Sequence, residues 1–364
     1  MAKIAVDARP LSIPTTGIGR YTQALLEFML DSEHQWYLYS HKPLLIDFES
    51  LNNVTVRSGA INKSSLSSIF AQVVFPLWSR IDKIDLFWSP RHHLPLCLGS
   101  SVVRVVTIHD LVWQRFPQTM SRSGLLLERL LMPPSLKTAD LVVTVSGSIS
   151  DELQQSFPKY AEKIQTIHEA PFLALANKPG PLGKYFLFVG TIEPRKNLRR
   201  LLEAYCSYRE LVTEPLPLKI CGGKGWGMPE LKGKVQELDL EGSVEILGYI
   251  TDEKLPDLYR EARALLIPSL YEGFGLPIVE AYSQGTPVLT ANRGAMAEIA
   301  GSAALTVNPD STTEIAHALA VLTEDHPKVK ELQIRALRRA SEFSWDKAAA
   351  ETLSVIESTL DRAR

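Results

Sequence analysis

The sequence predicts an α/β protein built from two doubly wound domains of similar size. Short β-branched runs alternate with longer helical patterns throughout the 364 residues, as expected for parallel sheets with crossover helices. A chain of this length is long for a single hydrophobic core, which favours two domains. The composition, 45% hydrophobic and 22% charged, is typical of a globular protein.

Candidate strands come in two series, one for each predicted domain. The first domain, residues 1–170, has runs at 3–7, 36–40, 54–57, 85–88, 102–107, 141–145 and 164–168. The second domain, residues 184–344, has runs at 185–190, 218–221, 244–248, 264–268 and 287–290. Residues 171–183 are rich in proline and glycine and lack periodicity, which predicts a linker. Residues 345–364 are predicted as one last helix, with Ser344 as its N-cap.

Charge and cysteine usage argue against several classes of protein. The net charge of −2 lacks the basic excess of nucleic-acid-binding proteins. Cys97, Cys206 and Cys221 are scattered without a CxxC pair, which favours a reducing compartment and no structural zinc. The opening "MAKIAVDARP" does not read as a signal peptide, and no apolar run approaches the roughly 18 residues of a membrane span. We therefore expect a cytoplasmic protein, attached at most to a membrane surface.

Two cations precede a helix in "GTIEPRKNLRRLLEAY", which begins at Gly190. Asn197 is a good N-cap, so Arg195 and Lys196 fall immediately before the helix. Cations usually lie at the other end, because the helix dipole is positive at its N-terminus. Their presence here favours an anion that they bind together with the backbone amides. A solvated basic loop is the plainer alternative.

Two glutamates flank a glycine turn in "YEGFGLPIVEA", residues 271–281. Gly273 and Gly275 allow close approach of a ligand, and a helix is predicted to begin near Pro277. Glu272 would lie in the loop and Glu280 on the first helical turn. Carboxylates accept paired hydrogen bonds from vicinal hydroxyls, so one nucleotide sugar could occupy both glutamates with its diphosphate between them. Alternatively, Glu272 is a surface loop residue, and Glu280 is a first-turn residue favoured by the positive end of the helix dipole.

The motifs "SLYEGFGLPIVEAYSQGTPVLT", "GTIEPRKNL" and "VTIHDL" resemble retaining glycosyltransferases of family 4. The resemblance covers nearly the whole chain. It implies the GT-B fold, in which two Rossmann-like domains face a central cleft and the last helix crosses back to the first domain. It also implies that the acceptor binds to the first domain and the donor to the second.

The resemblance implies a role for each matching residue of the second domain. Glu280 would hold the donor ribose and Glu272 the transferred sugar, while Lys196 would bind the phosphates. Many members carry an arginine where this chain has Thr191, and Arg195 would supply that charge instead. The backbone near the sugar and phosphates would come from Gly190, Phe274, Gly275 and Leu276.

In the first domain the resemblance points to three loops that follow strands. His109 would lie by the reaction centre and contact the donor sugar. The helix start at Gly17 and Gly19 would let acceptor and donor phosphate approach, and the acceptor cleft would include Arg91, His92, His93 and Asp110. The plainer alternatives are a histidine that caps a strand end and a simple helix start.

The reaction implied is transfer of a hexose from a nucleoside diphosphate to an acceptor hydroxyl, with retention at the anomeric carbon. Lys196, Arg195 and the helix amides would stabilise the leaving diphosphate, so we expect no obligatory metal or other cofactor. The variant "EPRKN" resembles bacterial enzymes of surface polysaccharide synthesis, which favours GDP-mannose as donor. Rhamnosyl or glucosyl transfer from GDP-, dTDP- or UDP-sugars remains an alternative, as do a sugar-nucleotide epimerase and a non-catalytic nucleotide-sugar-binding protein.

Residues 120–137 mix arginine and lysine with six leucines. They could form an amphipathic helix at a membrane surface, which would suit a lipid-linked glycan acceptor. A core-facing helix with a basic outer side is the alternative. The segment "VVFPLWSR", residues 73–80, has the same ambiguity.

Overall fold

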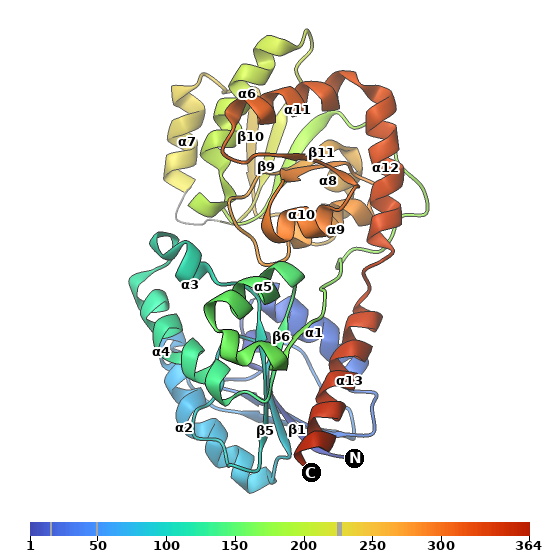
Figure 1. Ribbon diagram of the computed structural model, residues 1–364. Coiled ribbons are helices and arrows are strands. Elements are labelled where there is room, and N and C mark those ends of the chain that lie inside the picture. Colours follow the sequence, from blue (N-terminus) through green and yellow to red (C-terminus); the bar gives the residue numbers. More distant parts are fainter. Residues whose placement is uncertain (15–16, 49, 224–227) are drawn as a thin grey trace. The chain divides into compact units, whose positions relative to one another are not determined.

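The computed structural model describes residues 1–14, 17–48, 50–223 and 228–364. The chain forms two compact units: unit 1 contains Met1–Glu169 and Trp345–Arg364, and unit 2 contains Ala170–Ser344 (Figure 1). The last helix, α13 (Trp345–Ala363), thus belongs to unit 1, where it packs against α1 (Gly17–Met29) and β5 (Val103–Ile108). Residues 171–183, expected as a linker, fall within unit 2.

Unit 1 is built on a parallel sheet of seven strands in the order β3-β2-β1-β4-β5-β6-β7. The order reverses between β1 and β4, and in sheets of this kind ligands bind at the carboxyl ends of the strands at such a point. All seven strands expected from the sequence are present. Their bounds are Lys3–Asp7 (β1), Gln35–Ser40 (β2), Val54–Ser58 (β3), Leu86–Ser89 (β4), Val103–Ile108 (β5), Leu141–Thr144 (β6) and Ile164–Thr166 (β7).

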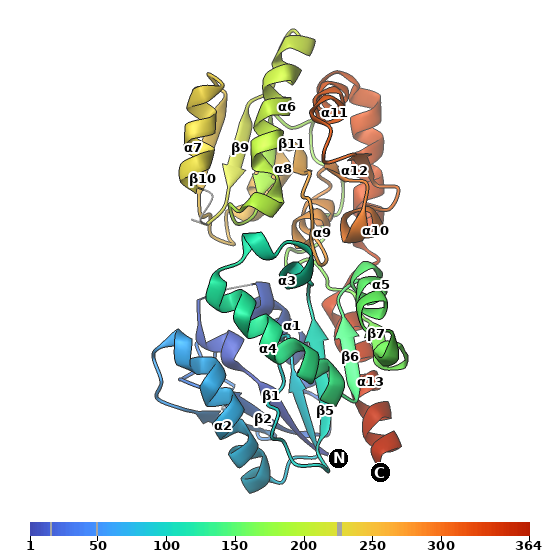
Figure 2. The ribbon, with the colours of Figure 1, turned by 60° about the vertical axis from the view of Figure 1, so that its left-hand side comes forward.

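Helices cover both faces of this sheet (Figure 2). The connection through α1 runs across the sheet in the opposite direction to those through α2 and α4. Right-handed crossovers therefore place α2 and α4 together on the face opposite α1. The helices between the strands are η1 (Arg9–Ser12), α2 (Ser64–Asp82), α3 (Val112–Arg115), η2 (Pro117–Thr119), α4 (Arg122–Thr138), α5 (Gly147–Ser156) and η3 (Pro158–Lys163).

Unit 2 is built on a parallel sheet of six strands in the order β10-β9-β8-β11-β12-β13. Its strands are Tyr185–Val189 (β8), Leu218–Cys221 (β9), Val244–Gly248 (β10), Ala262–Ile267 (β11), Val288–Ala291 (β12) and Ala304–Val307 (β13). The sequence reading missed β13, because this edge strand is short and half-exposed and gives little apolar signal. Its helices are η4 (Pro194–Lys196), α6 (Leu198–Leu211), α7 (Met228–Glu237), α8 (Leu255–Glu261), α9 (Leu276–Ser283), α10 (Gly294–Ala300), α11 (Thr312–Glu324) and α12 (His326–Ala340).

The central strands of unit 2 place its two motif loops side by side. Every residue of β11 is buried, as expected for a parallel strand covered on both faces. The predicted core face of α6 is confirmed, since Leu198, Leu201, Leu202 and Tyr205 are all buried. Because β8 and β11 are neighbours at the point where the strand order reverses, the loops that follow them leave the same edge of the sheet. These are the loops with the cations and the glutamates.

Candidate active site

The two motif loops of unit 2 are joined by hydrogen bonds. The Leu270 amide donates to the Arg195 carbonyl at 2.7 Å, and Arg195 Nη1 donates to the Tyr271 carbonyl at 3.1 Å. Main chain and side chain of Arg195 therefore both fix η4 against the loop after β11. The relative position of the cations and Glu272 depends on these bonds rather than on side-chain length alone.

Glu272 receives three side-chain hydrogen bonds. Its Oε1 accepts from Lys196 Nζ at 2.5 Å and from Ser269 Oγ at 2.8 Å, and its Oε2 accepts from Arg195 Nη1 at 2.8 Å. Arg195 Nη2 also forms an ion pair with Glu193 at 2.7 Å. The structure thus brings Lys196, Arg195 and Glu272 into one network.

The charges of this network act on a buried carboxylate. Burial alone would raise the pKa of Glu272, but the charges of Lys196 and Arg195 outweigh it and lower the pKa to about 2. The group is therefore ionised near neutral pH. Two cations face two carboxylates, so the network has no net charge as it stands. The sequence reading, by contrast, assigned Glu272 to the sugar and the cations to the phosphates of one ligand, and did not expect them to pair with each other.

Lys196 keeps hydrogen-bonding capacity in this network. An ammonium group has three N–H donors, and within the described residues Glu272 supplies the one oxygen that accepts from its Nζ. The Lys196 side chain is 10% exposed. A phosphate oxygen could therefore bind to this group without displacing Glu272.

The glycine turn ends at a helix that begins one residue earlier than expected. Gly275 is the N-cap of α9, with φ at 102°, and a Cβ there would lie 2.6 Å from the Met296 methyl. Only glycine fits this conformation and this contact. Since α9 starts at Leu276, Glu280 lies on its second turn and not, as predicted, on its first.

Glu280 is buried and has a partner that the sequence did not suggest. Its Oε2 accepts a hydrogen bond from the Tyr259 hydroxyl at 3.0 Å, and its side chain is buried together with that of Tyr259. The ribose role of Glu280 remains a prediction.

The end of β8 lies against the end of β9. A Cβ at Gly222 would come within 1.9 Å of the Gly190 carbonyl, and a Cβ at Gly190 would lie 3.8 Å from Lys196 Nζ. Gly190 therefore belongs to the immediate surroundings of the ammonium group, and its predicted role in donor binding remains a prediction. Thr191, where an arginine was expected by resemblance, is exposed and directly follows it.

Asn197 begins α6 as predicted, but its side chain does not cap the helix. Its backbone is left-handed, with φ at 63°, and its amide nitrogen donates to the carbonyls of Pro268 at 2.9 Å and Pro309 at 2.7 Å. The side chain thus connects η4 to the loops after β11 and β13. The left-handed backbone explains why it points away from the helix amides.

We expect Asn197→Ala to lower the free energy of unfolding by about 2–5 kcal/mol. Two buried carbonyls lose their donor, and alanine disfavours the left-handed backbone. Urea denaturation measures the loss. Asn197→Gly is the matched control, because it loses the same hydrogen bonds without the backbone strain. Its free energy of unfolding should lie between those of the parent and Asn197→Ala. Equal stability of Asn197→Ala and the parent would contradict the assignment.

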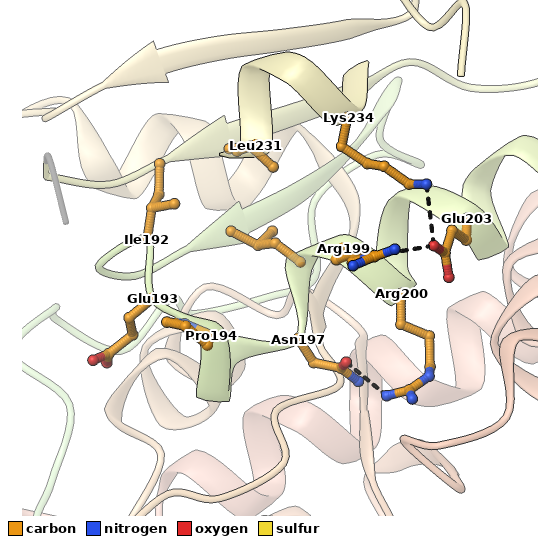
Figure 3. Close-up of a pocket in the computed structure, with 10 residues that line it drawn as sticks. Ile192, Glu193, Pro194, Asn197, Arg199, Arg200, Glu203, Leu231 and Lys234 are labelled. Carbon is orange, nitrogen blue, oxygen red and sulfur yellow. Dashed lines mark hydrogen bonds and ion pairs between the residues drawn. The ribbon is translucent and has the colours of Figure 1, made fainter. Parts of the chain in front are cut away.

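A cavity of about 450 Å³ opens beside η4 and the start of α6 (Figure 3). Its lining includes Asn197, but none of the predicted site residues. Glu203 accepts from Arg199 at 3.4 Å and pairs with Lys234 at 3.3 Å. Because these cations already have carboxylate partners, the cavity gives no argument for an anion site of its own. It is lined by Ile192, Glu193, Pro194, Asn197, Leu198, Arg199, Arg200, Glu203, Leu231 and Lys234.

His109 in unit 1 is fixed by partners on both sides of its ring. Nδ1 lies 3.1 Å from Glu169 Oε1, and Nε2 lies 3.0 Å from the Pro90 carbonyl. Tyr21 packs edge-on against the ring at 4.7 Å between centroids. A ligand that binds a ring nitrogen would have to replace one of these oxygens. The Glu169 carboxylate and the Pro90 carbonyl hold the ring in its present position. The contact of His109 with the donor sugar remains a prediction.

His92 and His93 share a carboxylate of α4. His92 Nδ1 and His93 Nε2 lie 3.4 Å and 3.1 Å from Glu128 Oε2. His92 Nε2 also accepts from the His109 amide at 3.1 Å, so Nδ1 of His92 carries the proton. Both histidines are buried, and each has one ring nitrogen close to the Glu128 carboxylate. The place of both histidines in the acceptor cleft, expected from the sequence, remains a prediction.

Arg91, the other predicted acceptor residue, differs from its histidine neighbours. Within the described residues its guanidinium makes no hydrogen bond or ion pair, and burial together with the nearby Arg9 charge lowers its pKa to about 10. Asp7, which also lies near it, is bonded to Arg9 at 2.8 and 2.5 Å. Two guanidiniums thus adjoin one carboxylate at the carboxyl end of the sheet. This is an environment that suits an anion.

The remaining predicted residues of unit 1 lie near the same edge of the sheet. Asp110 Oδ1 accepts from the Val112 amide at 3.1 Å and so helps to start α3. Gly17 and Gly19 lie in the first turn of α1; Gly17 is exposed, and a Cβ there would meet nothing within 4 Å. Packing within the protein does not require glycine at 17. Thr15 and Thr16, which directly precede Gly17, lie outside the described residues.

Each of the two units matches a known protein family. Residues 15–170 match the profile described as Glycosyltransferase Family 4, and residues 177–339 match that of Glycosyl transferases group 1. The chain belongs to glycosyltransferase family 4. This family 4 protein is 29% identical to the O-antigen chain mannosyltransferase B of Escherichia coli, over 97% of its own length and 98% of that protein. It is also 28% identical to the O-antigen chain mannosyltransferase RfbU of Salmonella typhimurium, over 71% and 72% of the two chains.

Solved structures establish that this glycosyltransferase has the GT-B fold. Sucrose-phosphate synthase from Thermosynechococcus elongatus superposes with a TM-score of 0.81 at 18% identity and covers 100% of both chains. WaaG, a glycosyltransferase of lipopolysaccharide biosynthesis, gives 0.74 at 14% identity, with 97% and 99% covered. HepE from Anabaena, in complex with UDP and glucose, gives 0.72 at 20% identity, with 98% and 100% covered.

Several contact partners of the predicted site residues escaped the sequence reading. They are Glu193, Ser269 and Tyr259 in unit 2 and Tyr21, Glu128 and Glu169 in unit 1. Two of them, Glu193 and Ser269, lie inside the quoted motifs, where the sequence analysis gave them no role. Within the described ranges, no three His, Cys, Asp or Glu side chains are grouped to hold a metal ion.

Proposed function

We propose that this glycosyltransferase moves mannose from GDP-mannose to a hydroxyl group of a glycan in bacterial O-antigen synthesis. The observation that carries the proposal is the network in which Glu272 joins Lys196 and Arg195 beside Gly190. It combines a carboxylate that suits sugar hydroxyls with an ammonium group that suits a phosphate. The choice of mannose and of the pathway is based on similarity to the two O-antigen mannosyltransferases, one of which matches over nearly its full length.

The donor would lie across the two loops of unit 2. Glu280 would accept from the ribose hydroxyls, Lys196 and the amide nitrogens at the start of α9 would bind the diphosphate, and Glu272 would orient the mannose. Arg195 would act mainly by holding Glu272 and adding positive charge. Its charge would replace that of the arginine missing at Thr191. This arrangement supplies the charge stabilisation that a divalent cation gives elsewhere, so we propose metal-independent transfer.

The acceptor would bind in unit 1 near Arg91. A guanidinium that makes no hydrogen bond within the described residues supports this role, whereas His92 and His93, which lie against Glu128, give it less support. Asp110 and the glycines of α1 lie near the same edge of the sheet and remain part of the proposed acceptor region. His109 would contact the donor sugar after exchange of one of its present partners.

The proposed chemistry retains the configuration of the anomeric carbon. The acceptor oxygen bonds to that carbon on the face from which the diphosphate departs, and the bond from carbon to phosphate oxygen breaks. The hydroxyl proton passes to the leaving diphosphate, so no protein base is needed. A covalent intermediate on Glu272 is disfavoured, because its carboxylate oxygens already accept from Lys196, Arg195 and Ser269.

Glucosyl transfer from UDP-glucose is the second candidate, since the structurally similar HepE binds UDP and glucose. A thermal-shift comparison of GDP, UDP and dTDP with their sugar conjugates, in EDTA, separates the two. A ligand at about 100 times its dissociation constant should add about 2.7 kcal/mol of stability. We expect stabilisation by GDP and GDP-mannose alone. A shift with UDP-glucose instead would identify UDP-glucose as the donor in place of GDP-mannose. If none of these ligands shifts the melting temperature, the proposed donor site is contradicted.

We expect Glu280→Ala to weaken binding of every nucleotide that carries a ribose by at least about tenfold, because two hydroxyls lose their acceptor. Isothermal titration with GDP measures the change. Tyr259→Phe is the matched control, because it removes the hydroxyl that donates to Glu280 and keeps the carboxylate. An unchanged GDP affinity in Glu280→Ala would contradict the ribose role.

A further inference from the structure

Helix α2 exposes a continuous row of large aliphatic side chains. Residues at positions spaced by three or four share one side of a helix, and this side of α2 is 41% to 66% exposed at each member. The row is about 22 Å long at 1.5 Å per residue. It consists of Leu66, Ile69, Val73, Leu77 and Ile81. Exposed aliphatic residues usually occur singly, so a row of five requires an explanation.

Helix α4 extends this surface on the same side of unit 1. Its Leu126 and Leu130 are 58% and 61% exposed. Both views place α2 and α4 next to each other (Figures 1 and 2). Gln72 of α2 and Ser135 of α4 hold the same loop between them, through hydrogen bonds to Leu94. We call the seven exposed side chains of the two helices the aliphatic face.

The exposed charges carried by the two helices of the aliphatic face have one sign. The exposed charged residues on α2, α4 and the two residues flanking α2 are all basic: Lys63, Arg80, Lys83, Arg122, Arg129 and Lys137. Each helix has one acidic residue, and both face inward: Asp82 binds Arg57 and Tyr39, and Glu128 binds His92 and His93. An apolar surface rimmed by lysine and arginine matches an anionic lipid bilayer.

We propose that the aliphatic face docks unit 1 on the surface of a bilayer that contains anionic phospholipid. A second copy of the chain fits less well. A twofold interface would bring the same basic rim together from both copies, with no exposed acid on these helices to neutralise it. Among the described residues no helix is long and apolar enough to span a membrane, so the contact would be peripheral. The inference concerns a surface distinct from the donor loops and does not depend on the identity of the sugar.

Co-sedimentation with large unilamellar vesicles tests the proposal. The full chain should bind vesicles of phosphatidylglycerol and phosphatidylethanolamine, bind phosphatidylcholine vesicles weakly, and be released by salt. The double variant Ile69→Gln/Leu77→Gln should lower the partition coefficient at least about tenfold, because two aliphatic anchors are lost. Arg122→Gln/Arg129→Gln should weaken binding to the anionic vesicles alone.

The matched control changes two exposed aliphatic residues elsewhere, Leu211→Gln/Ile334→Gln, which lie on α6 and α12 of unit 2. It should bind vesicles like the parent. The change in melting temperature with nucleotide should be the same in all variants, which excludes loss of fold as the cause. Absence of binding to anionic vesicles would overturn the proposal. So would a parent that is dimeric by light scattering and becomes monomeric in Ile69→Gln/Leu77→Gln, because the face would then bind a second copy.

Discussion

Lys196→Ala should lower turnover by about 100- to 1,000-fold, the cost of losing one oriented donor to developing charge in a transition state. The ammonium group is held in place by Glu272 at 2.5 Å and keeps donors for a phosphate. Binding of the nucleoside diphosphate should weaken as well, because the same charge faces the phosphates before and after transfer. Release of GDP from GDP-mannose at saturation measures the turnover.

Lys234→Ala is the matched control for this variant. Lys234 is also buried and also paired with carboxylates, Glu203 and Glu237, but it lies on α7. Its loss should change turnover less than about threefold, as expected for a residue that makes no contact with the departing phosphate. Urea denaturation of both variants shows whether each is folded at the assay temperature. A folded Lys196→Ala protein with nearly normal turnover would refute the assignment.

The fold was predictable because its signals are local and repeated. Apolar β-branched runs such as Val103–Ile108 mark buried parallel strands, and all seven strands of unit 1 were recognised in this way. The missing strand, Ala304–Val307, lies at the edge of its sheet and is half-exposed, so it lacks the same pattern. The strand orders could not be read from the sequence, since they depend on contacts between distant residues.

The site was predictable only as far as its motifs extend along the chain. Glu272, Lys196 and His109 were recognised because glycine, proline and charged residues follow strands at these positions. Their contacts were not, because Glu272 and Lys196 are 76 residues apart and His109 and Glu169 are 60 apart. Distances of this kind are set by strand order, which brings the ends of β8 and β11 together.

The aliphatic face shows a further limit of periodicity. The row from Leu66 to Ile81 has the same spacing as a buried helix face, and α2 also has a buried side with Phe75 at its centre. A helix that is apolar on two sides gives no clear indication of which side is covered. The sequence reading therefore concentrated on residues 120–137, where the basic residues are more obvious, and left α2 ambiguous.

Glu272→Gln should separate the folding role of this carboxylate from its role toward the sugar. Removing one partner of a buried ionic network leaves Lys196 and Arg195 uncompensated and should lower the free energy of unfolding by about 3–5 kcal/mol. Glu203→Gln is the matched control, since its carboxylate also serves two cations but is 35% exposed. The free energy of unfolding of the control should fall by at most about 1 kcal/mol.

Ligand binding to Glu272→Gln should change in a direction that a purely structural residue would not produce. GDP should bind at least as tightly as to the parent, because two cations without their carboxylate attract a diphosphate more strongly. GDP-mannose should lose its advantage over GDP, because the proposed acceptor of the mannose hydroxyls is gone. Equal losses for both ligands would instead indicate a general disturbance of the loop.

The pH dependence of stability provides an independent test of the same carboxylate. Because Lys196 and Arg195 lower the pKa of Glu272 from 4.5 to about 2, its contribution is complete above pH 4.5. As the pH falls below 4.5, the unfolded chain takes up a proton that the folded protein still excludes, and the contribution declines until it is lost near pH 2. The difference in stability between the parent and Glu272→Gln should therefore shrink steadily over this range. A difference that stays constant from pH 6 to pH 3 would mean that the charge of Glu272 does not hold the two loops together.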